Sequence, residues 1–97
     1  MTPSKVKIRI TRILEKGECP LGHKAGEEFI YPEDRGKICA SAMHSIFPAV
    51  RVLQFGGSFP WEEDPDRAVV CCPDASNPVV FDLKRVEVDQ TAELGLL

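Results

Sequence analysis

The sequence predicts an α+β domain in which a mainly antiparallel four-stranded sheet carries one kinked helix on a face, in the order strand, strand, helix, strand, strand. Three observations support this prediction. Apolar and basic residues alternate over residues 5–10, apolar residues recur every three or four positions over residues 43–53, and the connections are too short for parallel crossovers except around the helix. A chain of 97 residues suffices for one hydrophobic core, so we expect residues 1–97 to form a single domain with its core at about residues 5–88.

The first strand, K-V-K-I-R-I at residues 5–10, is the clearest element. Its apolar residues fall on one face and its basic residues on the other, as in a half-buried strand. Arg12 then falls on the apolar face, which predicts a bulge or the end of the strand near residues 11–12. A second strand is expected at residues 27–31, between a connection rich in Gly and Pro and the turn-forming run P-E-D-R-G-K.

The helix is expected between residues 38 and 55, where the apolar stripe consists of Met43, Ile46, Phe47, Val50 and Leu53. Pro48 lacks an N–H and clashes with the carbonyl four residues earlier, which predicts a kink or two short segments. The Gly56-Gly57 pair ends the helix. Two further strands are expected at residues 68–72 and 79–88, whereas residues 89–97 have no assigned partner and are expected to fray or to dock across a subunit interface.

The composition excludes several function classes. The net charge of −3 and the scattered cations leave no basic stripe, so we expect no nucleic acid partner. No stretch approaches the roughly 20 apolar residues that span a bilayer, and the first residues lack an apolar signal core, so we expect no membrane contact and a cytoplasmic location, where the four cysteines stay reduced. No nucleotide cofactor is expected, because no Gly-Lys-Ser/Thr follows Gly56-Gly57.

The two histidines of the chain each follow a cysteine closely, as Cys19-x3-His23 and Cys39-x4-His44. Thiolate and imidazole are the ligands of zinc and related metals, although neither pair matches the more specific Cys-x2-Cys pattern. Residues five apart on a helix point ~140° apart, so Cys39 and His44 share a site only if one of them lies at a helix end. If Cys39 lies at or just before the N-cap, free N–H groups and the helix dipole stabilise its thiolate, either as a metal ligand or as a nucleophile.

The adjacent Cys71 and Cys72 point to opposite faces of a strand, so only one of them can join the site. Cys72 lies at the exit of the strand and is assigned to the site, and Cys71 is assigned to the core. The predicted metal site then has five candidates, one more than a tetrahedral centre needs: Cys19, His23, Cys39, His44 and Cys72. The competing interpretation is unrelated packing, because free cysteine is one of the most buried residue types.

Three stretches, CPLGHKAGEEF, ICASAMHSIFPAVRVLQFGGSFPWEEDP and VCCPDASNPVVFDL, together resemble a family of uncharacterised small proteins of about 90 residues from anaerobic bacteria and archaea. The resemblance covers nearly all of residues 5–85, and it does not include Cys71. It implies a conserved Cys/His site but no established reaction. The matching residues are Cys19, Pro20, Gly22, His23, Cys39, His44, Pro48, Phe55, Gly56, Gly57, Pro60, Trp61, Cys72, Pro73 and Asp74.

Three functions follow as hypotheses. The first is a small cytoplasmic protein whose Cys/His site binds a transition metal, zinc or iron, in a structural or regulatory role. The second is a thiol-dependent enzyme or accessory subunit that uses Cys39 with His23 or His44 as general acid or base. The third is a module that binds a protein partner through the acidic loop at residues 58–66 with Trp61 as its anchor, and a homo-oligomer is the alternative partner. For Trp61 itself we favour a position folded back over the core, with the acids as a solvated face.

Overall fold

The computed structural model describes residues 3–86 and has the predicted α+β architecture. Its strands and helices follow in the order β1 (Lys5–Ile13), β2 (Glu28–Tyr31), the short 3-10 helix η1 (Arg35–Lys37), α1 (Ala40–Gln54), β3 (Arg67–Cys71) and β4 (Val79–Val86). The four predicted strands and the predicted helix are all present, and η1 is an addition within the expected turn after β2. The predicted tail at residues 89–97, and the predicted extension of the last strand to residue 88, lie outside the described residues.

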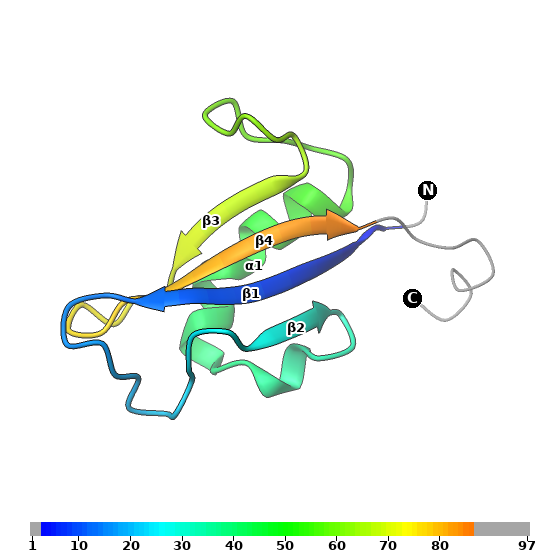
Figure 1. Cartoon of the computed structure of the whole chain (residues 1–97). Coiled ribbons are helices and arrows are strands. Elements are labelled where there is room, and N and C mark those ends of the chain that lie inside the picture. The colour runs from blue at the N-terminus through cyan, green and yellow to red at the C-terminus, as the bar shows by residue number, and fades with distance from the viewer. Residues whose placement is uncertain (1–2, 87–97) are drawn as a thin grey trace.

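All strand pairings are antiparallel, and the strand order across the sheet is β2-β1-β4-β3 (Figure 1). Ile8 at the centre of β1 is paired with Phe29 of β2 on one side and Leu83 of β4 on the other. The register between β1 and β4 shifts between Ile10 and Arg12, which confirms the predicted bulge. The bulge explains how β1 continues to Ile13 although its alternation changes after Ile10.

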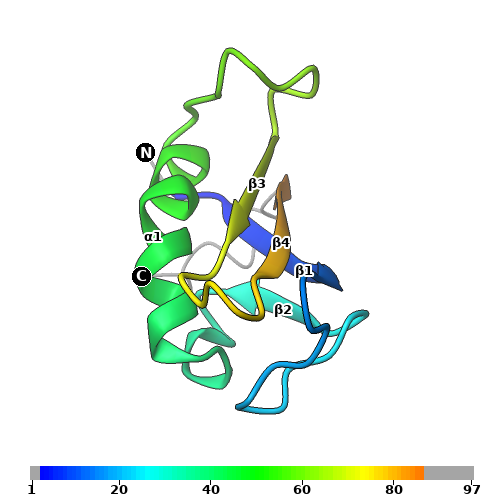
Figure 2. The same cartoon turned by 90° about the vertical axis from the view of Figure 1, so that its left-hand side faces the viewer.

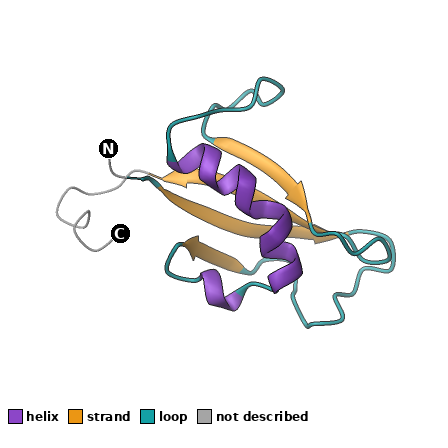
Figure 3. Cartoon of the chain, turned by 180° about the vertical axis from the view of Figure 1, so that it is seen from behind, coloured by secondary structure: helices purple, strands orange, loops and turns teal. Residues whose placement is uncertain are grey.

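The helix α1 covers one face of the sheet and leaves the other face open (Figures 2 and 3). The core lies between these two layers. Fully buried side chains of the sheet meet the buried residues of the helix there, which recur at helical spacing: Ala42, Ile46, Val50 and Leu53. Phe47 was predicted in this stripe but is 40% exposed, and its ring lies beside that of Tyr31 at the edge of the helix.

The helix α1 begins and ends where the sequence predicted, but Pro48 does not divide it into two segments. Cys39 is the N-cap residue. At the other end, Gly57 N–H donates to Val52 and Gly56 N–H to Leu53, with Gly56 at φ +85°, which is a Schellman motif. The helix runs through Pro48 as one element and not as two segments. Pro48 is exposed, so the carbonyl that loses its helical partner lies on the solvent side.

Within residues 3–86, no helix has the length and the apolar character that crossing a membrane requires.

Candidate functional site

Three segments that are distant in the sequence meet at one end of the sheet. They are the loop between β1 and β2, the beginning of α1, and the loop between β3 and β4 (Figure 1). A cavity of about 240 Å³ lies between them, and four of the five predicted ligands line it: Cys19, His23, Cys39 and Cys72. We call this cavity the thiol pocket. The structure therefore brings together most of the side chains that the sequence assigned to one site.

A tight turn places Cys19 and His23 on the pocket wall. The N–H of Gly22 donates to the carbonyl of Cys19 at 2.9 Å, with Pro20 at the second turn position, where a fixed φ is favoured. Gly22 has a φ of +88°, in the left-handed region that glycine adopts without steric cost. The CPLGH segment therefore reverses the chain immediately before His23.

Both ring nitrogens of His23 have partners. Nε2 lies 3.1 Å from the backbone nitrogen of Cys39, and Nδ1 lies 2.9 Å from Oε1 of Glu27. A backbone N–H can only donate, so Nε2 is the acceptor, and Nδ1 carries the proton that it donates to Glu27. The side chain is only 12% exposed, and the ring of Phe29 packs against it edge to face. The contacts hold a neutral imidazole with its lone pair directed at the N-cap of α1.

Glu27 is the residue that orients this imidazole. Its carboxylate accepts a hydrogen bond from the backbone N–H of Lys24 at 3.0 Å in addition to the one from His23. The hydrogen bond from Lys24 makes the largest contribution to lowering the pKa of the Glu27 carboxyl below its ordinary value, and the hydrogen bond from His23 makes the next largest. Glu27 is therefore ionised at neutral pH and fixes the tautomer of His23.

The N-cap position gives Cys39 a distinct environment. Its side chain makes no capping hydrogen bond, although its carbonyl accepts the N–H of Met43 and begins the helix. Its N–H is used by His23, so the imidazole and the thiol belong to neighbouring groups on the same wall. The unpaired N–H groups of the first helical turn and the helix dipole favour negative charge at this end.

Cys72 lies at the exit of β3 and is tied into the loop that follows. Its sulfur accepts the N–H of Val79 at 3.2 Å and lies 3.8 Å from the carbonyl oxygen of Asn77, to which the thiol donates. Cys71, in contrast, is exposed and lies on β3 outside the pocket. The prediction that Cys71 occupies a core position is wrong, because the alternation of β3 turns this side chain towards solvent on the open face of the sheet.

Asn77 joins the two loops that carry Cys19 and Cys72. It is buried, and its Oδ1 accepts the backbone N–H of Glu18, the residue before Cys19. Asp74 shapes the same loop, because its Oδ1 accepts the backbone N–H groups of Ser76 and Asn77. The hydrogen bond from Glu18 to Asn77 thus links the two loops directly.

The fifth predicted ligand, His44, is not brought to the pocket. It is exposed on α1, one turn beyond Cys39 and pointing in another direction. Among residues 3–86, no three His, Cys, Asp or Glu side chains are grouped closely enough to hold a metal ion together. The four residues of the thiol pocket thus share a cavity without forming a preorganised coordination cluster, and metal binding stays a prediction.

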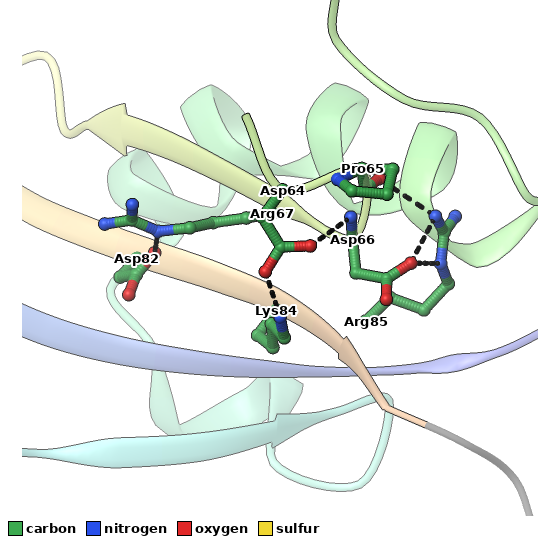
Figure 4. A network of polar contacts seen from close by, with 7 residues as sticks. All are labelled: Asp64, Pro65, Asp66, Arg67, Asp82, Lys84 and Arg85. Atoms are coloured by element: carbon green, nitrogen blue, oxygen red, sulfur yellow. Dashed lines mark hydrogen bonds and ion pairs between the residues drawn. The ribbon is translucent and has the colours of Figure 1, made fainter. Parts of the chain in front are cut away.

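The side chain of Trp61 lies outside the core. Trp61 is 74% exposed, and its ring is tilted against that of Phe59, which packs on the core, with ring centroids 5.2 Å apart. The expectation that it folds back over the core is wrong. The acids of this loop were expected to form a solvated face, but two of them form ion pairs. Asp64 pairs with Lys84, and Asp66 binds the guanidinium of Arg85 (Figure 4).

Sequence reasoning missed two residues of the site, Glu27 and Asn77. Glu27 stands four positions after His23, so an acid following a predicted turn histidine was the available signal. Asn77 gave no such signal, because its role depends on how two loops meet. Comparison of the chain with protein-family models, with curated proteins and with solved structures found no match. The family resemblance and its implied site therefore stay predictions.

Proposed function

We propose that this protein is a thiol-dependent enzyme, or the accessory subunit of one, with Cys39 as its nucleophile and His23 as the general acid and base. The observation that carries the proposal is the series of contacts from Glu27 through His23 to the backbone of Cys39, at the wall of a cavity. A nucleophile, a base beside it and a third group that orients the base are the parts that covalent catalysis requires.

The contacts support a definite role for each group. Nε2 of His23 exchanges the hydrogen bond from the Cys39 backbone for the proton of the Cys39 thiol, and the thiolate that results attacks an electrophile held in the pocket. The negative charge on sulfur then lies at the beginning of α1, where free N–H groups and the helix dipole favour it. Glu27 keeps the other ring proton on Nδ1 and stabilises the imidazolium that forms.

The experiment that tests this proposal is site-resolved labelling of reduced, metal-free protein with iodoacetamide, followed by peptide mass spectrometry. Cys71 is a matched internal reference, because it is more exposed than Cys39 and lies outside the pocket. We expect Cys39 to react faster than Cys71 despite its lower exposure. Uniform slow labelling of all four thiols would reject the proposal.

A second candidate function is a soft metal centre, zinc or iron, held by Cys19, His23, Cys39 and Cys72. Two observations favour it. The donor set of three thiols and one imidazole is that of known structural zinc sites, and Glu27 accepts from the far nitrogen of His23, as the carboxylates that orient zinc-binding histidines do. Metal binding would require these side chains to rearrange, because Nε2 of His23 already accepts a hydrogen bond and the four proposed ligands are not grouped around one point.

Chelation distinguishes the two candidates. Protein purified without an affinity tag under anaerobic conditions is analysed for metal and then labelled before and after addition of a chelator. A metal centre predicts near-stoichiometric metal and pocket thiols that label only after chelation. The thiol enzyme predicts labelling of Cys39 that the chelator does not change.

A further inference from the structure

The walls of the thiol pocket are mainly apolar. Besides the three thiols and His23, they are formed largely by Pro20, Leu21, Ala42, Pro73, Val79 and Phe81. Of the described residues that line the cavity, Asp74 is the one with a charged side chain, and one of its oxygens is used by two backbone N–H groups. The free N–H groups at the beginning of α1 are assigned to the Cys39 thiolate, so an anionic ligand in the rest of the pocket would lose its hydration and meet a carboxylate in place of a cation. The pocket therefore suits an uncharged ligand.

The volume of the pocket limits the size of that ligand. An engineered protein cavity of about 150 Å³ binds benzene, so the cavity of about 240 Å³ accommodates roughly ten non-hydrogen atoms. A tripeptide-sized molecule does not fit entirely within it.

Three of the four cysteines face this one small cavity, although a nucleophilic site needs only one. A second thiol beside the first has a specific use in disulfide chemistry, because it can break the mixed disulfide that the first thiol forms. Cys72 is the better suited of the two remaining thiols. Its sulfur accepts the backbone N–H of Val79, a contact that supports negative charge on sulfur once the thiol has given up its longer contact to the carbonyl of Asn77.

We infer that the substrate of the thiol pocket is a small, uncharged disulfide and that Cys72 is the resolving thiol. This inference rests on the proposed role of Cys39 as nucleophile. The Cys39 thiolate attacks one sulfur of R–S–S–R, a bond forms between Cys39 and that sulfur, and the other half leaves and takes the proton from His23 as RSH. Cys72 then attacks the sulfur of Cys39, its own proton passes to the departing group, and the second RSH is released. The protein loses two protons and two electrons, and the substrate gains them.

The test uses the full reduced chain and an excess of bis(2-hydroxyethyl) disulfide, which is uncharged and small enough for the cavity. Peptide mapping of the wild-type product is expected to find a Cys39–Cys72 disulfide, with both thiol halves of the reagent released. Cys72→Ser is expected to stop at a mixed disulfide on Cys39, whereas Cys71→Ser behaves as the wild type. A bridge to Cys19, or trapping by Cys19→Ser in place of Cys72→Ser, overturns the assignment of Cys72.

The charge preference is tested with dithiodiglycolate, a dicarboxylate disulfide of similar size. For each reagent, the rate of mixed-disulfide formation at Cys39 is divided by the rate at exposed Cys71 of the same chain. The two ratios are then compared. This internal reference removes the effect of the net charge of the protein. We expect the uncharged disulfide to be preferred by about tenfold or more, since ~1.4 kcal/mol of lost solvation gives that factor. Equal ratios would contradict the assigned substrate class.

The failure of this inference can be distinguished from the failure of the proposed function. If iodoacetamide labels Cys39 selectively but the wild type forms no Cys39–Cys72 disulfide, only the disulfide inference is wrong. If Cys39 is not selectively labelled, both are wrong.

Discussion

Nε2 of His23 accepts the backbone N–H of Cys39 at 3.1 Å, across 16 residues of sequence. This contact joins the β1–β2 loop to the beginning of α1 and directs the imidazole at the residue whose thiol we propose as the nucleophile. The contact between His23 and Glu27 on the opposite side of the ring makes the arrangement specific, because it settles which ring nitrogen keeps the lone pair.

Replacement of Glu27 by Gln is expected to reduce stability at neutral pH and to leave it unchanged in acid. The pKa of Glu27 is lowered in the folded chain, so its ionised form contributes stability above the ordinary value of about 4.5, and this contribution is lost as the pH falls through the lowered value. Urea midpoints of wild type and Glu27→Gln should therefore differ at pH 7 and converge in acid. A difference that grows as the pH falls would contradict the assigned charge state.

Gly22→Ala is expected to destabilise the protein by about 1–2 kcal/mol, because an L side chain is strained at a positive φ even where space is open. Gly36→Ala is the matched control, since that glycine also has open space and no positive φ. It should change stability by less than about 0.5 kcal/mol. Equal effects in urea unfolding would show that the backbone conformation of the CPLGH turn is not what requires glycine.

Arg85 is expected to be the main anchor of the loop between α1 and β3. Its guanidinium donates to the carbonyl of Pro65 and the carboxylate of Asp66 (Figure 4). It also donates to the carbonyls of Leu53 and Gly57. Arg85→Ala should cost about 2–4 kcal/mol in urea unfolding, since it leaves several carbonyls without donors.

Arg85→Lys tests whether the fork of the guanidinium matters. A lysine keeps the charge but cannot donate in several fixed directions, so we expect it to recover only part of the loss. Full recovery would indicate that charge alone holds the loop.

Trp61→Ala is expected to change stability by less than about 0.5 kcal/mol, because its side chain is 74% exposed. Ile46→Ala, at a fully buried position of α1, is expected to cost about 2–5 kcal/mol and serves as the comparison. Thermal or urea unfolding measures both. A large loss for Trp61→Ala would place this side chain in the core after all.

Much of the fold follows from local pattern. The period-two alternation of residues 5–10 predicted β1, the change in phase at Arg12 predicted the bulge, and the Gly56-Gly57 pair predicted the end of α1. The helical period predicted α1, but it placed Phe47 in the core, since a stripe of apolar letters does not fix how far the helix is rotated about its axis. The exposed position of Pro48 explains why the helix continues through it.

The site was predictable in its residues more than in its geometry. Cys39 at the N-cap, and Cys72 in preference to Cys71, followed from helix ends and strand alternation. The hydrogen bond to Glu27 did not, because it depends on the exact path of the turn. Trp61 was misplaced for a related reason: Phe59 of the same loop packs against the core while Trp61 is exposed, and no local pattern distinguishes the two aromatic residues.

The most direct test of the central claim compares the iodoacetamide labelling rate of Cys39 in the wild type, in His23→Ala and in His44→Ala, each in reduced, metal-free protein. His44 is the matched control, because it is the other histidine of the chain and is exposed on α1 outside the pocket. We predict that His23→Ala slows the labelling of Cys39 by tenfold to a hundredfold, as expected for loss of a general base, with the rate at Cys71 unchanged. His44→Ala should leave both rates unchanged. Equal rates at Cys39 in all three proteins would contradict the proposed pairing of Cys39 with His23.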